Sequence, residues 1–221
     1  MFQKLGQNLA LVLGMENETY MFQGYLFFRS YRMEMLAHFC RRQKYKLYCG
    51  DNVMGKVKSI NHIAFAVKDF DAALENAIEV LGGEMMMEFE SIEDRYKGAC
   101  VRFGDSIMSF ISSDDSESFI SKHVEKYGNS IQHIGLEIDN IEEYVANLEE
   151  KGVRVDKSEM SDVDYQEALV GPKVGNGVVL QLTGWKAGPF DATYEGCDRL
   201  CKKYSQNPKL NLLAGNQLPK P

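Results

Sequence analysis

The feature that most constrains this chain is an internal repeat in its middle. The segment INHIAFAVKDFDAALENAIEVLGGEM, from residue 60, aligns with IQHIGLEIDNIEEYVANLEEKGVRV, from residue 131. The alignment places His62 on His133, and each histidine follows Ile and a polar residue and precedes another Ile. A repeat of this kind indicates two copies of one supersecondary unit, which must pack together to bury their apolar faces.

Each copy predicts a strand, a helix and three further strands. Apolar residues recur at spacings of three and four from Phe70 to Leu81 and from Ile141 to Leu148, as in a half-buried helix. A strand candidate follows in each copy, EMMMEFESI in the first and VRVDKSEM in the second. A hairpin comes next, YKGACVRFGDSIMSFI in the first copy and YQEALVGPKVGNGVVLQLT in the second. We therefore predict two βαβββ units, over about residues 59–113 and 130–184.

The two ends of the chain do not repeat. Residues 1–58 are expected to form an N-terminal extension, with one helix and a possible strand in GYLFFRSYRMEMLAHFCRRQKYKLY. Residues 186–221 are expected to form a C-terminal extension, with one helix around ATYEGCDRLCKKY and an irregular tail in NPKLNLLAGNQLPKP. The predicted fold class is α+β, with residues 59–185 as two units paired around a cleft.

The composition narrows the cellular setting. A net charge of -7 argues against general nucleic-acid binding, which requires a basic face. No apolar run approaches the roughly 18 to 20 residues that cross a membrane, and the N-terminus has no convincing cleavage site. The 5 cysteines form no CxxC pair, which favours a reduced, cytoplasmic setting.

A pair of βαβββ units that each open with a histidine and Ile resembles the vicinal oxygen chelate superfamily, the glyoxalase and methylmalonyl-CoA epimerase group. The phrases SIQHIGLEIDNIEE and EEKGV carry this resemblance, which covers about residues 59–185. It implies a cleft in which side chains from the first and last strands of each unit chelate a divalent metal ion. The four positions map onto His62, His133, Ser109 and Gln181. The family usually has Glu where this chain has Gln181, and Gln, Glu or His in place of Ser109.

The resemblance implies Zn²⁺, Ni²⁺, Co²⁺, Mn²⁺ or Fe²⁺ as the cofactor, because imidazole and carboxamide ligands suit these ions. Ser109 and Gln181 predict weaker binding than a carboxylate would give. Glu137 lies four residues after His133 and is expected on the same strand face, which makes it a candidate base. Glu93 and Glu167 are the other candidate bases. Tyr96, Tyr165 and Trp185 are expected to line or cap the cleft.

The resemblance therefore predicts a metal-dependent isomerase, epimerase or lyase, in which a metal-polarised oxygen and a Glu base act on a small carbonyl- or carboxylate-containing substrate. A non-catalytic protein that sequesters a small molecule in the same cleft is the alternative, and Fe(II) dioxygenase-like chemistry is a second one. A homodimer is expected by analogy with the family. The expected partners are small molecules, with neither nucleic acid nor membrane.

Overall fold

The computed structural model describes residues 55–160, 164–186 and 188–221. The predicted N-terminal helix and strand fall outside these residues. No helix in the described part of the chain is both long enough and apolar enough to cross a membrane.

The predicted βαβββ organisation is confirmed in both units. The first unit contains β1 (Val57–Ala66), α3 (Phe70–Glu75), the single π-helical turn η1 (Asn76–Val80), β2 (Glu84–Ser91), β3 (Tyr96–Phe103) and β4 (Ser106–Ser112). The connecting helix is α4 (Phe119–Tyr127). The second unit contains β5 (Ser130–Ile138), α5 (Ile141–Glu150), β6 (Val155–Glu159), β7 (Tyr165–Val170) and β8 (Val179–Trp185).

The helices of the two units begin at equivalent places in the repeat. The side chain of Asp69 accepts a hydrogen bond from the backbone N–H of Ala72, and that of Asn140 accepts one from Glu143. These N-caps satisfy donors that the first helical turn leaves unpaired. The first helix differs from the prediction at its end, because Leu81 N–H bonds to Asn76 O and widens the last turn into a π-helix.

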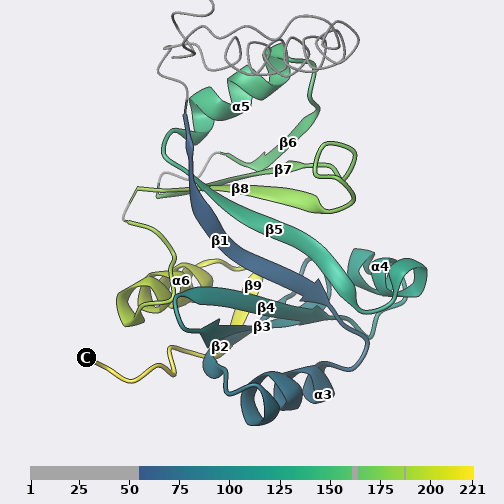
Figure 1. The fold of residues 1–221 in the computed structure, drawn as a ribbon, viewed down its shortest axis with the longest axis vertical. Coiled ribbons are helices and arrows are strands. Elements are labelled where there is room, and N and C mark those ends of the chain that lie inside the picture. The colour runs from purple at the N-terminus through teal and green to yellow at the C-terminus, as the bar shows by residue number, and fades with distance from the viewer. Residues whose placement is uncertain (1–54, 161–163, 187) are drawn as a thin grey trace, which may run out of the picture. The chain divides into compact units, whose positions relative to one another are not determined.

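One nine-stranded sheet joins the two units, in the order β6-β7-β8-β5-β1-β4-β3-β2-β9. Strands β1 and β5 pair antiparallel at its centre, while β1 pairs parallel with β4 and β5 parallel with β8. Figure 1 shows β1 running alongside β5, with α3 beside the strands of the first unit and α5 beside those of the second. The two histidine-bearing strands are therefore direct neighbours.

The C-terminal segment forms α6 (Tyr194–Gln206) and β9 (Leu210–Ala214). The helix was predicted, but the expectation of an irregular tail is wrong, because β9 pairs antiparallel with the edge strand β2. In β9, half-buried and exposed residues alternate, as in a strand with one covered face. Its neighbouring Pro, Gly and Asn residues conceal this short alternation in the sequence.

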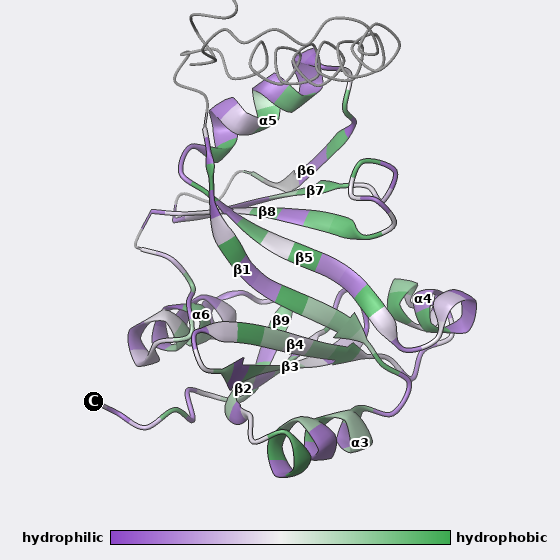
Figure 2. Cartoon of the chain, viewed as in Figure 1, coloured by the Kyte–Doolittle hydropathy of each residue, from purple (hydrophilic) through white to green (hydrophobic). Residues whose placement is uncertain are grey.

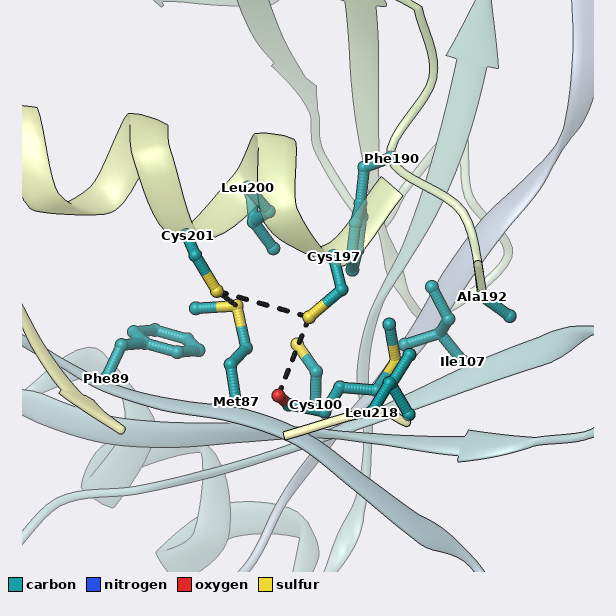
Figure 3. Close-up of a cluster of buried hydrophobic side chains, with 11 residues drawn as sticks. Met87, Phe89, Cys100, Ile107, Phe190, Ala192, Cys197, Leu200, Cys201 and Leu218 are labelled. Carbon is teal, nitrogen blue, oxygen red and sulfur yellow. Dashed lines mark hydrogen bonds between the residues drawn. The ribbon is translucent and has the colours of Figure 1, made fainter. Parts of the chain in front are cut away.

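Helices cover both faces of the first unit. Val67, Phe70 and Ala99 are buried together where α3 packs. Cys100, the next residue of β3, belongs to a different buried cluster, and adjacent residues of a strand point to opposite faces. Figure 3 shows this second cluster beneath α6, where sulfur-containing residues gather. Its members include Met87, Phe89, Cys100, Cys197, Leu200 and Cys201.

Apolar side chains of the second unit form a separate core beneath α5. The buried members are Ile138, Ile141, Val145, Ala168, Val170 and Leu182. Hydrophilic residues occur along α4, α5 and α6 between apolar ones, as Figure 2 shows. The helices are therefore amphipathic, and each contributes its apolar stripe to a core.

Candidate functional site

Two histidine rings meet where the two units join. His62 projects from β1 and His133 from β5, and their Nε2 atoms are 3.0 Å apart. The rings stand almost perpendicular, with centroids 5.1 Å apart and an interplanar angle of 87°. His62 pairs with Gly135 across the strands, and a Cβ atom at Gly135 would lie 2.5 Å from two atoms of the His62 ring. The glycine of the HIGLEI phrase therefore makes room for the ring.

The hydrogen bonds around His62 define its tautomer. The side-chain amide N–H of Asn61 donates to the backbone carbonyl of Phe190. Because a carbonyl only accepts, Asn61 Oδ1 must be the atom that lies 2.8 Å from His62 Nδ1. His62 therefore carries its proton on Nδ1 and has a bare lone pair on Nε2.

His133 has an equivalent neighbour. Its Nδ1 lies 2.5 Å from Oε1 of Gln132, the residue that precedes it as Asn61 precedes His62. With Gln132 Oε1 as the acceptor, His133 takes the same tautomer, and the Nε2 lone pairs of the two histidines then face each other.

Burial keeps both imidazoles neutral at neutral pH. It lowers the pKa of His62 to about 4. Burial also lowers the pKa of His133 well below its usual value, and the nearby charge of a protonated His62 lowers it further. Two neutral rings with facing lone pairs repel each other unless a cation lies between them. His62 and His133 would therefore hold a divalent metal ion through Nε2 if one is bound here, because neutral imidazole is a common metal ligand.

The four side chains at the predicted metal positions line one cavity of about 70 Å³. Gln181 Oε1 is buried there and has no hydrogen-bond partner among the described residues. The Oγ atom of Ser109 lies 3.3 Å from Cys100 Sγ. The structure therefore brings together His62, His133, Ser109 and Gln181. No group of three His, Cys, Asp or Glu residues in the described part of the chain is placed to hold a metal, so a third protein ligand here would be the carboxamide.

The cavity wall is largely aromatic, and much of it comes from outside the predicted ligand set. Trp185 Nε1 is buried without a hydrogen-bond partner in the described part of the chain. The indole therefore offers a donor at the cavity. The remaining lining residues are Asn61, Phe89, Tyr96, Cys100, Ile111, Tyr165, Thr183, Phe190, Leu200 and Tyr204.

None of the three predicted glutamates lines this cavity. Glu93 lies in the turn after β2, and its carboxylate is 2.8 Å from Lys209 Nζ. Glu137 is buried, and burial raises the pKa of its carboxyl while Lys58 acts in the opposite direction. Glu167 accepts a hydrogen bond from the hydroxyl of Tyr165, which does line the cavity. Glu167 is therefore connected to the cavity through one hydroxyl group.

Sequence reasoning missed Asn61 and the wall residues Phe190, Leu200 and Tyr204. Asn61 carried a usable signal, because a carboxamide precedes the histidine in both copies of the repeat. The other three residues belong to the non-repeating C-terminal segment, which gave no such comparison.

Comparison with known proteins agrees with this architecture. Residues 61–166 match the family model described as the Glyoxalase/Bleomycin resistance protein/Dioxygenase superfamily. Mouse mitochondrial methylmalonyl-CoA epimerase is 26% identical over 130 residues, 58% of this chain and 73% of the relative. A Caenorhabditis elegans relative called putative protein C31H2.4 is 29% identical over 118 residues, 53% of this chain. The matched region spans only 31% of that nematode protein.

A solved structure supports the fold. A variant of the Streptomyces coelicolor methylmalonyl-CoA epimerase in complex with 2-nitronate-propionyl-CoA has a TM-score of 0.54 and 24% sequence identity. The similarity covers 60% of this chain and 97% of that one. The paired βαβββ units have the fold of that epimerase, and the family match leads to one assignment: residues 61–166 belong to a domain of the Glyoxalase/Bleomycin resistance protein/Dioxygenase superfamily.

Proposed function

We propose that this protein is a divalent-metal-dependent isomerase or epimerase acting on a small carbonyl-containing substrate. The observation that carries the proposal is the pair of bare Nε2 atoms, 3.0 Å apart, in the cavity that also holds the partnerless Gln181 Oε1. Two imidazoles and one carboxamide oxygen suit Zn²⁺, Ni²⁺, Co²⁺, Mn²⁺ or Fe²⁺. When bound, such an ion polarises a carbonyl or enolate oxygen as a Lewis acid.

The groups that hold this ion are themselves held in place. Asn61 Oδ1 accepts a hydrogen bond from the Nδ1–H group of His62, and the Asn61 side-chain N–H donates one to the Phe190 carbonyl. Together these two hydrogen bonds fix the orientation of the His62 ring and its tautomer. Outer hydrogen bonds of this kind orient metal-binding histidines and raise their basicity. The hydroxyl of Ser109 is hydrogen-bonded to the thiol of Cys100, so we assign Ser109 to the cavity wall. The ligand role is left to His62, His133 and Gln181.

Proton transfer is assigned to Tyr165 and Glu167. Burial, and then the charge of Glu167, raise the pKa of Tyr165 well above its usual value, so its hydroxyl stays protonated. A C–H bond beside the substrate carbonyl breaks, its electron pair forms the enolate, and its proton passes to Tyr165 Oη. The original Tyr165 proton passes at the same time to Glu167 Oε2, along the existing hydrogen bond. Reversal of this relay, from Glu167 to Tyr165 and from Tyr165 to a neighbouring atom on the same face, completes isomerisation. Epimerisation needs a second proton donor on the opposite face, a role that a water molecule in the cavity would fill.

The comparisons support the reaction class. The mouse protein, which is similar to this chain in sequence, is named an epimerase. The Streptomyces coelicolor protein, which is similar in fold, is also named an epimerase. Their substrate is a property of those proteins, and we do not extend it to this chain.

A non-catalytic binding protein is the second candidate. The observation that favours it is that no Asp or Glu among the described residues lines the cavity. Fe(II) dioxygenase chemistry is less favoured, because its usual ligand triad includes a carboxylate.

The test begins with metal analysis of purified protein, before and after reconstitution with each of the five ions, beside His62→Ala and His133→Ala. Deuterium exchange at carbon is then followed by NMR for pyruvate, 2-oxobutyrate and methylmalonyl-CoA. We expect stoichiometric metal in the parent protein only and exchange of at least one substrate. Tyr165→Phe should keep the metal and lose the exchange, while Tyr144→Phe, in α5, should keep both. Absence of stoichiometric metal after all five reconstitutions would overturn the metal-dependent function, and bound metal without exchange would favour the binding protein.

A further inference from the structure

Three sulfur atoms meet between α6 and β2, outside the candidate site. Cys197 and Cys201 are one turn apart on α6, so both side chains project from the same side of the helix. Their Sγ atoms are 4.0 Å apart, and Cys201 Sγ lies 3.9 Å from Sδ of Met87, a residue of β2. Figure 3 shows the three sulfur atoms directed toward one another. None of these three side chains lines the cavity that holds His62 and His133.

The sulfur atoms are shielded from water. The exposed fraction is 0% for Met87 and for Cys197, and 6% for Cys201. All three belong to the buried cluster of apolar side chains beneath α6. Thiolates and thioethers are soft ligands, which select soft ions such as Cu(I) over hard cations that prefer oxygen. The ligand chemistry of this cluster therefore suits Cu(I).

The number of ligands separates Cu(I) from other ions that prefer sulfur. Structural zinc sites are almost always four-coordinate, and iron–sulfur clusters usually take four cysteines. Within the described ranges, no group of three His, Cys, Asp or Glu residues is placed to hold a metal. Cu(I) is satisfied by fewer ligands, so two thiolates and one thioether complete its coordination.

The spacing of the sulfur atoms is compatible with one shared ion. An ion about 2.3 Å from each of two sulfur atoms can join atoms that are up to about 4.6 Å apart. The separations of 4.0 Å between Cys197 and Cys201 and 3.9 Å between Cys201 and Met87 are both shorter than this limit. The three side chains can therefore approach one ion without a change of the backbone.

The charges also allow a cation here. A hydrogen bond from Cys197 lowers the pKa of Cys201, although burial acts in the opposite direction, so one thiol of the pair loses its proton more readily. Binding of Cu(I) releases both thiol protons to water and leaves one net negative charge on the ion and its two thiolates. The hydrogen bond with Glu84 raises the pKa of Arg102, and the charge of a Cys197 thiolate raises it further. The Arg102 guanidinium is therefore close enough to offset part of that negative charge.

We propose that Cys197, Cys201 and Met87 form a Cu(I) site that joins α6 to β2. This site uses none of the residues assigned to the isomerase or epimerase function, so either assignment stands without the other. Because α6 supplies part of the cavity wall, Cu(I) in this site holds that wall in place.

The first test measures Cu(I) affinity of the reduced full-length protein without oxygen, by competition with the Cu(I) chelator bicinchoninate. The starting protein has the substitutions Cys40→Ser and Cys49→Ser, which remove the two thiols outside the described residues. We expect it to take one equivalent of Cu(I) from the chelator. His62→Ala should bind Cu(I) equally well, because the histidine pair is a separate site.

Substitution of each ligand identifies the site. Loss of an outer-shell partner typically costs about 10- to 100-fold in metal affinity, so Cys197→Ser and Cys201→Ser, which remove a direct ligand, should each cost at least about 100-fold. Met87→Leu nearly conserves volume and should weaken binding about tenfold. Met85→Leu is the matched control, since Met85 also lies in β2 but packs in the cluster beneath α3, and it should leave the affinity unchanged.

Hydrogen exchange of backbone amides tests the link between α6 and β2 without any substitution at the site. With free Cu(I) at 100 times its dissociation constant, amides that exchange only when α6 leaves β2 should slow by about 100-fold. Amides of α5 should exchange at the same rate with and without Cu(I).

Three results would overturn the proposal. They are failure to take Cu(I) from the chelator, equal affinity in the starting protein and both cysteine variants, and loss of binding in His62→Ala, which would place the ion in the cavity. Urea unfolding of each variant shows whether it is folded. If the serine variants do not fold, Met87→Leu against Met85→Leu and the exchange of α6 decide the question, and no effect in either contradicts the proposal.

Discussion

Replacing Gly135 by Ala tests the histidine pair directly. The added Cβ would lie 2.5 Å from both Cε1 and Nδ1 of His62. Ordinary contacts begin near 3.4 Å, so the ring must move by about 0.9 Å. That ring is held between Asn61 and His133 by contacts of 2.8 and 3.0 Å, and a displacement of this size breaks at least one of them.

The expected effect on metal affinity follows from this displacement. Loss of an orienting contact to a metal-binding histidine typically weakens affinity by about 10- to 100-fold. Titration of the metal-free Gly135→Ala protein with Co²⁺, followed by absorbance, measures this loss. Overpacking should also lower the free energy of unfolding by roughly 1–3 kcal/mol.

Gly184→Ala is the matched control. Its Cβ would lie 2.7 Å from Cγ2 of Ile141, a comparable overlap in the core beneath α5. This variant should lose similar stability and keep the parent metal affinity. If Gly135→Ala binds Co²⁺ as tightly as the parent protein and Gly184→Ala, the assignment of His62 as a ligand is wrong.

Three further predictions concern acid, the tautomer and the core. In the metal-free protein, unfolded His62 takes up a proton below pH 6.5 and folded His62 only near pH 4, so the free energy of unfolding should fall by about 3 kcal/mol as the pH drops through this window. Urea unfolding at several pH values measures the slope, and His62→Gln should reduce it by the share of His62 and leave that of His133. Asn61→Leu should weaken Co²⁺ binding about 10- to 100-fold, whereas Asn61→Asp, which still accepts the Nδ1 proton, should lose less. Leu182→Ala, at a side chain 1% exposed, should cost roughly 2–5 kcal/mol in urea unfolding, and Leu213→Ala, at one 52% exposed, less than about 0.5 kcal/mol.

The sequence predicted the parts of the fold that recur within it. The repeat identified both βαβββ units and aligned His62 with His133 and Ser109 with Gln181. The resemblance to the vicinal oxygen chelate superfamily implied that these four side chains share a cleft, and all four line one cavity. Duplication made the two units recognisable, because each copy could be compared with the other. Pairing of β9 with β2 had no such internal reference and joins residues more than a hundred positions apart, so local pattern could not reveal it.

Strand parity alone did not place the glutamates in the cavity. Glu137 shares a strand with His133, but four residues of strand span about 13 Å, which is long compared with a cavity of this size. Register shifts between β1 and β5 also disturb simple alternation along the pair. Glu93 lies in a turn, where periodicity gives no direction at all.

The position of α6 and β9 in the chain sets an order of events during synthesis. Both histidines and Gln181 precede residue 186, whereas the wall residues Phe190, Leu200 and Tyr204 follow it. Since synthesis runs from the N-terminus and local contacts form before distant ones, the growing chain presents an open histidine pair before it presents a closed cavity. Closure of the cavity therefore depends on a segment that can dock only after the repeat that carries both histidines has been made.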